Sequence, residues 1–161
     1  MEEMDIVTGC SYPASHLSNF EAYTFVIDGI TCHSMEGFLQ SLKFSEEEKQ
    51  REVCLLVGKQ AKFKGKRKKW WKTQTLYWKG VEIDRHGEVY QELIKKAFDA
   101  LAENKQFQET LLATGDAVIR HSEGKSDPTK TILTEQEFCS QLMRVRERMK
   151  NHVNNNGNRD V

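Results

Sequence analysis

The clearest periodic pattern in the chain lies in residues 34–44, where apolar side chains recur at positions i, i+3, i+4 and i+7. This spacing is typical of the buried face of an α-helix. Ser34 directly precedes the pattern and is a favourable N-cap residue. The sequence therefore predicts a helix after Ser34 whose core-facing residues are Met35, Phe38, Leu39 and Leu42.

A polar stripe follows the same predicted helix. Glu36, Gln40 and Lys43 recur at helical spacing on a second face. They supply a carboxylate, an amide and an amine, which can act as an acid or base, a hydrogen-bonding group and a nucleophile. An ordinary solvated face has the same spacing, so the pattern by itself leaves both interpretations open.

Two short strands are predicted before this helix. Residues 23–27 and 30–33 are rich in β-branched and aromatic side chains, and they flank Asp28-Gly29, a pair that tolerates the positive φ of a tight hairpin. The hairpin would lead the chain directly into the helix. Residues 1–15 contain several turn formers and are predicted to be loosely structured, while residues 76–83 fit either a short strand or an extended excursion.

Start and stop signals place further helices downstream. Ser45 and Glu48 match a capping box, and Gly58 is a plausible stop for the helix that they begin. Apolar residues in helical register over residues 89–101 predict the main core helix. A shorter helix is expected to end near Gly115.

A polar loop precedes the last predicted helix. It contains His121 and Asp127, whose side chains suit either an active-site loop or ordinary loop and turn positions. Thr134 and Glu137 then form a second capping box ahead of an apolar stripe. The last helix is therefore expected to begin at this pair.

The most uneven charge in the chain lies in residues 59–72. This segment holds eight basic side chains and no acidic one, and Trp70 and Trp71 interrupt it. Such a segment can hold phosphates by charge and stack a base on an indole ring. It can equally be a solvated basic loop whose tryptophans pack on the core.

The composition limits the class of protein but does not indicate a binding partner. The 161 residues suit one domain, and 24 basic residues balance 24 acidic ones, so net charge argues neither for nor against nucleic acid. The four cysteines are scattered without a CxxC pair, which favours a reduced cytoplasmic setting without a bound metal. No cofactor is expected. No apolar signal core or membrane-length run is present, so a soluble protein is expected.

The order of these motifs along the chain resembles the NADAR family, also called YbiA-like. The resemblance covers about residues 16–149, and its motifs lie at residues 17–20, 28–29, 34–44, 61–66, 111–115, 121–122 and 142–146. It implies a single-domain α+β fold, predominantly α-helical, with a small N-terminal β-hairpin or sheet. Residues 16–150 would form this domain, residues 1–15 an N-terminal extension and residues 151–161 a flexible tail.

The resemblance also implies an N-glycosidase. Described family activities cleave a phosphoribosylated amino-pyrimidine from riboflavin synthesis or remove ADP-ribose from modified guanine in DNA. The implied substrate is an ADP-ribosyl or phosphoribosyl compound, such as ADP-ribosylated guanine, an NAD-derived metabolite or a riboflavin intermediate. The partner would be a nucleotide-like small molecule or ADP-ribosylated nucleic acid.

Several residues match the family's motifs position by position. The SNF element corresponds to Ser18, Asn19 and Phe20, and the polar positions of S-x-E-x-x-x-Q-x-x-K correspond to Glu36, Gln40 and Lys43. The glycine of the A-x-x-x-G-R element corresponds to Gly65, followed here by Lys66 and Arg67, and Trp71 matches a later tryptophan.

The later loop departs from the family pattern. Arg120 stands where many members carry an acid before the histidine, and Asp127 is not followed by the Trp and Gly of D-x-x-W-G. The segment 70–85 is also longer than in the simplest members. These differences leave the choice of substrate open.

The residues suggest a specific mechanism. Glu36 would stabilise positive charge at the anomeric carbon or activate water, or Lys43 would attack that carbon and form a Schiff base. Phosphates would lie against basic side chains, and an aromatic ring would stack on the base or ribose. The remaining candidate substrate-binding residues are Ser18, Asn19, Phe20, Gln40, Lys62, Gly65, Lys66, Arg67, Trp71, His121 and Asp127.

Two other function classes fit the same sequence. One is a non-catalytic module that binds ADP-ribose or nucleic acid through residues 59–72, which the altered loop after residue 120 favours. The other is a helical protein-interaction domain with an exposed Trp70/Trp71 patch.

Overall fold

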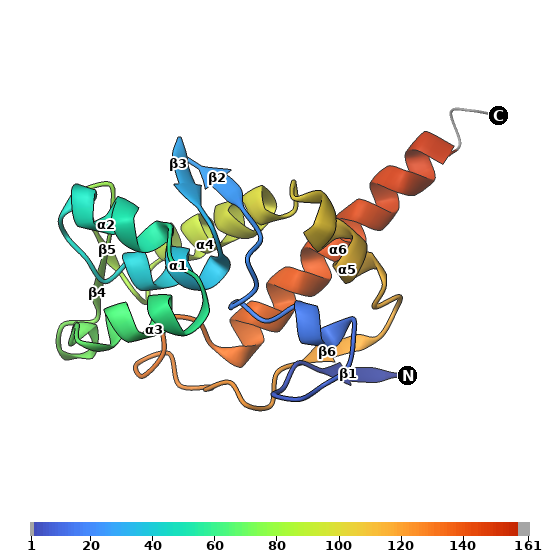
Figure 1. Cartoon of the computed structure of the whole chain (residues 1–161), viewed down its shortest axis with the longest axis horizontal. Helices are drawn as coiled ribbons and strands as arrows, with labels where there is room; N and C mark the ends of the chain where they lie inside the picture. Colours follow the sequence, from blue (N-terminus) through green and yellow to red (C-terminus); the bar gives the residue numbers. More distant parts are fainter. Residues whose placement is uncertain (1, 158–161) are drawn as a thin grey trace.

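The structure, a computed structural model, describes residues 2–157. Within them, six α-helices are combined with six short strands, which pair into three separate two-stranded sheets (Figure 1). The mainly helical α+β class expected from the sequence is confirmed. None of the described helices is long and apolar enough to cross a membrane.

The predicted hairpin and the helix after it are confirmed. Strands β2 (Phe25–Ile27) and β3 (Ile30–Cys32) pair antiparallel, and Asp28 and Gly29 between them have φ values of 49° and 79°. Two successive positive φ angles match the twist of a tight hairpin. Helix α1 (Met35–Ser41) follows, and the Ser34 hydroxyl accepts a hydrogen bond from the Gly37 amide at 2.9 Å.

The region after α1 differs from the sequence-based prediction. Helix α2 (Glu47–Cys54) begins two residues after Ser45, and its N-cap residue Glu46 makes no side-chain capping bond. Gly58 does not end this helix but begins another, α3 (Gly58–Lys66). The basic segment is therefore largely helical rather than a loop.

Lysine, glutamine and alanine are good helix formers, and Ala61 and Gly65 give α3 a narrow buried face. That face packs on α1, whose contacts with α2 and α3 are the most extensive between helices (Figure 1). Helix α1 is thus held between two neighbours. A short 3-10 turn, η2 (Trp70–Lys72), follows α3.

The extended segment after η2 forms a second hairpin. Strands β4 (Thr75–Trp78) and β5 (Val81–Asp84) pair antiparallel around a tight turn. Helix α4 (Glu88–Leu101) is the expected main core helix, and α5 (Lys105–Leu112) ends just before the predicted glycine stop.

The N-terminal residues are more ordered than the sequence suggested. Strand β1 (Glu3–Asp5) pairs in parallel with β6 (Val118–Arg120), and the Ile6 side chain after it is 3% exposed. A short 3-10 turn, η1 (Ala14–His16), lies nearby in sequence. The expectation of a loose segment was wrong here because the partner of β1 lies more than 100 residues away in the sequence, where local patterns cannot reveal it.

The last helix, α6 (Glu135–Gly157), is the longest and projects from the body of the protein at its C-terminal end (Figure 1). Its predicted capping box is confirmed, because the Thr134 amide donates to Glu137 at 2.8 Å and the Glu137 amide donates to Thr134 at 3.0 Å. Of the tail expected over residues 151–161, residues 151–157 continue the helix and residues 158–161 lie outside the described part.

Candidate functional site

The polar stripe of α1 does not face bulk solvent. Gln40 is buried, with 7% of its surface exposed, and Glu36 and Lys43 are half-buried. The stripe lies against α3, because the residue at position 65 of α3 contacts Gln40 directly. Of the two interpretations that the spacing left open, a solvated charged face is therefore wrong.

Glu36 is held at both its backbone and its side chain. Its amide donates to the Asn19 carbonyl at 2.9 Å, which joins the 18–20 segment to the first turn of α1. Its carboxylate accepts one hydrogen bond, from Gln40 Nε2 at 2.8 Å. Burial raises the pKa of Glu36, and the opposing influence of Gln40, Lys43 and Lys62 does not cancel this effect.

Lys43 lies just beyond α1, two residues after its last residue Ser41, in the turn that follows the helix. Its ammonium group makes one long hydrogen bond, 3.4 Å, to the Gly65 carbonyl. Burial lowers the pKa of Lys43 to about 8; Glu36 opposes this shift and the charge on Lys125 adds to it. Within the described residues, neither Glu36 nor Lys43 takes part in an ion pair.

The contact between Gln40 and Gly65 explains why glycine is needed in α3. A Cβ atom at position 65 would lie 1.8 Å from Gln40 Oε1, which is an impossible distance. Gln40 Oε1 is also the one buried side-chain nitrogen or oxygen among the described residues that has no hydrogen-bond partner. An unsatisfied buried polar atom is uncommon in native proteins, and a hydrogen-bond donor from a water or a ligand would satisfy it.

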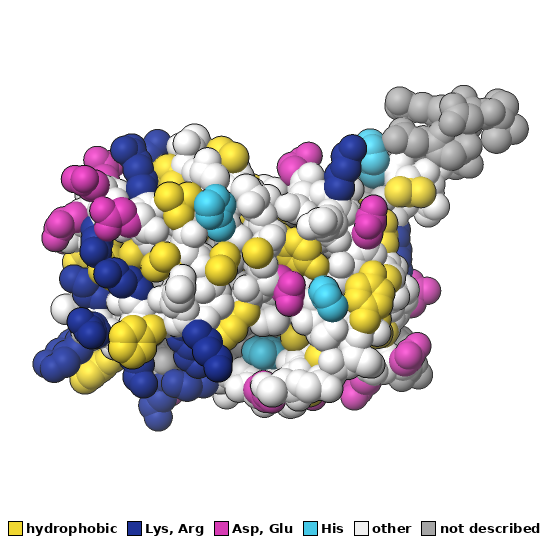
Figure 2. All heavy atoms as spheres, viewed as in Figure 1, with side chains coloured by type: hydrophobic (Ala, Val, Ile, Leu, Met, Phe, Trp, Pro, Cys, Tyr) yellow, Lys and Arg dark blue, Asp and Glu magenta, His cyan; other side chains and the backbone are white. Residues whose placement is uncertain are grey.

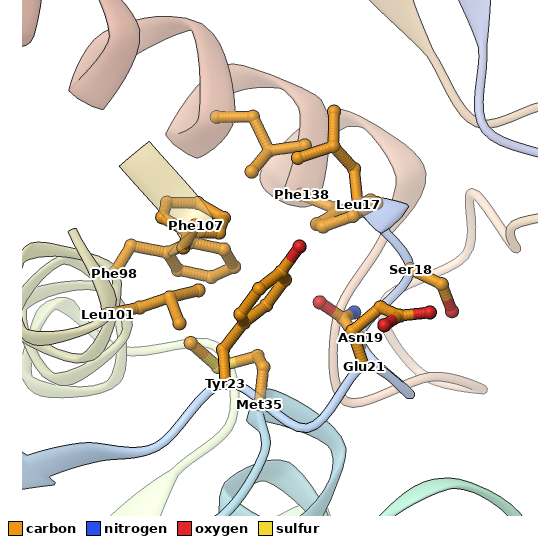
Figure 3. A pocket seen from close by; sticks show the side chains of 11 residues that line it. Leu17, Ser18, Asn19, Glu21, Tyr23, Met35, Phe98, Leu101, Phe107 and Phe138 are labelled. Carbon is orange, nitrogen blue, oxygen red and sulfur yellow. The ribbon is translucent and has the colours of Figure 1, made fainter. Parts of the chain in front are cut away.

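The 18–20 segment forms a compact turn at the N-terminal end of α1. Ser18 Oγ accepts from the Phe20 amide at 3.2 Å, and Phe20 lies beside Gly58 at the start of α3. Ser18 and Asn19 also line a small cavity, with Tyr23 and Met35 (Figure 3). Its volume of about 10 Å³ holds at most one water, and neither Glu36 nor Lys43 lines it.

The basic residues of α3 divide between its two flanks. Lys62 influences the Glu36 carboxylate, and Lys66 lies one helical turn further on the same flank. Arg67 lies on the other flank, with its guanidinium 5.5 Å from the Phe63 ring centre. The structure therefore separates Arg67 from the two lysines with which the sequence grouped it.

The two tryptophans after α3 have different environments. Trp70 is 8% exposed and belongs to the core, whereas Trp71 is 54% exposed and lies under the Lys72 ammonium. The expectation that both tryptophans form one exposed patch was wrong, because only the second is accessible.

His121 and Asp127 have local structural partners. His121 Nδ1 hydrogen-bonds the Ile6 carbonyl at 2.6 Å, and its ring packs edge-on against Phe138. The Asp127 carboxylate accepts from the amide and hydroxyl of Thr129, and these hydrogen bonds lower its pKa. Their observed contacts thus order the loop and its link to β1.

Two further side chains act on the parts of the molecule described above, and the sequence analysis did not single them out. Lys125 belongs to the polar loop but acts electrostatically on Lys43. Arg85 is 1% exposed, and its guanidinium forms a two-bond ion pair with Glu137 at 2.6 and 3.2 Å. Arg85 also donates to the Thr131 carbonyl, so it fixes the segment that returns from this loop to α6. An arginine between a strand and a helix gives no local pattern from which this role can be inferred.

Comparison with known proteins finds similarity over most of the chain. A family model described as bacteriophage protein GP30.3 matches residues 11–147. An Enterobacteria phage T4 protein, described as an uncharacterized 17.1 kDa protein in the Gp30-rIII intergenic region, is 38% identical over 153 residues, which cover 91% of this chain and 99% of that protein. The solution structure of E. coli YbiA superposes with a TM-score of 0.60 at 20% identity, covering 94% of this chain and 88% of that one. At this identity the YbiA match shows a shared fold.

Proposed function

The chain belongs to the bacteriophage GP30.3 family and has the fold of YbiA, and on that premise we propose that it is an N-glycosidase acting on an ADP-ribosyl or phosphoribosyl substrate. The motif resemblance to the NADAR family supports this activity, and the YbiA fold agrees with that resemblance. The reaction would be hydrolysis of the bond between a ribose anomeric carbon and a base nitrogen.

One observation carries the proposal: Glu36 is a half-buried carboxylate with a single side-chain hydrogen bond and no ion pair within the described residues. Holding such a group away from water costs free energy unless a partner neutralises it. A substrate that develops positive charge beside the carboxylate would provide that partner. Buried groups with shifted pKa values gather at functional sites for this reason.

The proposed chemistry follows from this geometry. As the glycosidic bond breaks, its electron pair leaves with the base and positive charge develops on the ribose. The Glu36 carboxylate stabilises this charge or removes a proton from the attacking water. Water supplies the hydroxyl that remains on the anomeric carbon and the proton that the base acquires. Gln40 holds the carboxylate in place through its amide nitrogen.

Lys43 offers a second route. A pKa of about 8 leaves part of the amine unprotonated near neutral pH, and it could then attack the anomeric carbon. The ring-opened product would be a Schiff base that water later hydrolyses. Borohydride would reduce this intermediate and fix the sugar to Lys43, whereas direct water attack would leave no covalent product.

The surrounding charges suggest how the substrate lies. Lys43, Lys62 and Lys125 act on the electrostatics of the stripe from the turn after α1, from α3 and from the polar loop. Phosphates would bind among these cations and Lys66, and Phe20 would stack on the base or ribose near Glu36. A nucleotide with its sugar at Glu36 and its phosphates toward Lys43 fits this arrangement.

The test is a substrate panel read by mass spectrometry for base release. It contains single-stranded DNA with ADP-ribosylated guanine, NAD, ADP-ribose and riboflavin-pathway intermediates. Glu36→Gln should slow release by roughly 10²- to 10⁴-fold, the usual contribution of such a group. Glu48→Gln, on the exposed first turn of α2, is the matched control and should retain full activity.

Two results would contradict the proposal. Full turnover by both Glu36→Gln and Lys43→Ala would remove the stripe from the mechanism. Thermal stabilisation by ADP-ribose without release of a base from any substrate would instead identify a non-catalytic binding module.

A further inference from the structure

A second concave surface lies on the flank of α3 that faces away from Glu36. It is a groove of about 460 Å³ between α3 and the start of α2. We call it the α2–α3 groove; its lining residues are Phe44, Glu46, Lys49, Phe63, Lys64, Arg67 and Lys68. Its volume is in the range that accommodates a nucleotide-sized group.

Charge distinguishes the groove from an ordinary surface depression. Four of its seven lining residues are cations and one is an acid. Lys49 is partly neutralised by Glu52 at 3.4 Å, but Lys64, Arg67 and Lys68 form no ion pair within the described residues. Figure 2 shows the Lys and Arg side chains gathered at the end of the molecule that carries α2 and α3. With four cations and one acid among its lining residues, the groove carries an excess of positive charge, which favours a polyanionic ligand.

Aromatic rings lie among these cations. Phe63 is 62% exposed, although a phenylalanine on a helix surface gains nothing from contact with water. Arg67 lies over its ring, and the Lys68 ammonium lies 5.0 Å from the centre of the ring of Phe44, which is itself buried. Further along the chain, the Lys72 ammonium lies over the ring of exposed Trp71 in the same manner. Cations that alternate with exposed rings are typical of surfaces that bind single-stranded nucleic acid.

We propose that the α2–α3 groove binds single-stranded nucleic acid, with backbone phosphates on Lys64, Arg67 and Lys68 and a base stacked on Phe63. A duplex would keep its bases stacked on one another and could not use the exposed ring. Binding would be independent of base sequence, because cations and a ring face distinguish bases poorly.

This site is separate from the proposed glycosidase site. On α3, Lys62 acts on Glu36, whereas Lys64 and Phe63 line the groove on the other flank. The helix thus divides its basic residues between two surfaces. The proposal does not depend on catalysis, and either one can fail without the other.

The experiment measures fluorescence anisotropy of labelled dT₁₂ with the full-length protein at several salt concentrations. The double variant Lys64→Glu/Lys68→Glu should weaken binding at least tenfold and reduce the slope of log affinity against log salt by about 1.4, at about 0.7 per phosphate contact on a single strand. Phe63→Ala should weaken binding about five- to 100-fold, in line with the loss of one stacked base. Its charge is unchanged, so its salt slope should stay that of the wild type.

The matched control is Lys95→Glu/Lys105→Glu, which makes the same change of net charge on exposed positions of α4 and α5. Equal weakening by both double variants would overturn the proposal, since it would show a response to net charge alone. Absence of dT₁₂ binding at low salt would also overturn it. So would equal affinity for dT₁₂ and for the mononucleotide dTMP, because a strand-binding groove requires more than one phosphate.

Base release from a free nucleotide separates the two proposals. Lys64→Glu/Lys68→Glu should retain it while losing dT₁₂ binding. Loss of release in Glu36→Gln with unchanged dT₁₂ binding is the reciprocal result.

Discussion

Two half-buried glutamates near the N-termini of helices differ in their hydrogen bonds and have pKa values shifted in opposite directions. Glu137, in α6, accepts hydrogen bonds from Arg85, Gln91 and the Thr134 amide. Burial alone would raise its pKa, but these donors outweigh burial and lower it. Glu36, in α1, accepts only from the Gln40 amide, and burial raises its pKa.

A single residue of helix register accounts for part of the difference. Glu137 stands three residues after its N-cap Thr134, the position from which a glutamate reaches back to the N-cap amide. Glu36 stands two residues after Ser34 and does not make this bond. Tertiary contacts complete the contrast, because Arg85 meets Glu137 whereas Glu36 meets a neutral amide. A carboxylate with several hydrogen-bond donors, such as Glu137, stabilises the fold, and we call it saturated. A carboxylate with one donor, such as Glu36, stays available to a ligand, and we call it unsaturated.

The largest expected effect tests the saturated carboxylate. Arg85→Met should lower the free energy of unfolding by about 3–5 kcal/mol, because it leaves Glu137 buried without its cation. Urea unfolding would measure this loss. Lys62→Met, beside the unsaturated carboxylate, should change stability by less than about 0.5 kcal/mol. Similar losses in the two variants would remove the contrast.

The second prediction concerns the contact that shapes the unsaturated site. Gly65→Ala should cost about 1–3 kcal/mol and reduce base release, because the new methyl group displaces the Gln40 side chain. In a Gln40→Ala background the same change should cost much less, since the obstructing atom is gone. A double-mutant cycle of unfolding free energies measures this coupling. Simple additivity would show that Gln40 and Gly65 do not constrain each other.

Gly37→Ala is the comparison for this cycle. A Cβ there would lie 2.5 Å from the Leu56 carbonyl oxygen, which belongs to the backbone. No side-chain truncation can relieve that contact, so the cost of Gly37→Ala should be unaffected by Gln40→Ala.

The third prediction uses the pKa of Lys43. Its folded-state pKa of about 8 is below the unfolded value of 10.5, so protonation opposes folding and stability falls as pH decreases through 8. Lys43→Met removes this penalty. It should be about 1–2 kcal/mol more stable than the wild type at pH 7, after allowance for partial solvent screening. Unfolding curves between pH 7 and 10.5 should show the advantage shrinking as pH rises.

The smallest expected effect comes from a direct comparison of variants at the two glutamates. The raised pKa of Glu36 makes its contribution to stability fully present below its unfolded value of 4.5 and lost as pH rises through the folded value. The lowered pKa of Glu137 gives the opposite dependence, with stability lost as pH falls. Glu36→Gln should therefore change stability by less than about 1 kcal/mol at pH 7, and in the stabilising direction. Glu137→Gln should be destabilising at pH 7 and approach the wild type in acid.

Local sequence information determined much of the fold and part of the candidate site. The spacing of Met35, Phe38 and Leu42 fixed the buried face of α1 and hence the direction of its polar stripe. Asp28-Gly29 specified a hairpin, and Thr134 with Glu137 specified the start of α6. Each of these features depends on side chains only a few residues apart. Their positions in the sequence therefore largely determine how they lie relative to one another in the structure.

The tertiary structure alone decided which surfaces those side chains meet. Helical spacing could not show that Glu36 is shielded from water or that Gly65 contacts Gln40, because both depend on α3 packing against α1. The charges of the basic segment were plain from the sequence, but only its helical form distributes them between two flanks. Polarity and periodicity are local properties of a chain, whereas burial and the identity of a partner are set by segments that meet only when the whole chain is folded.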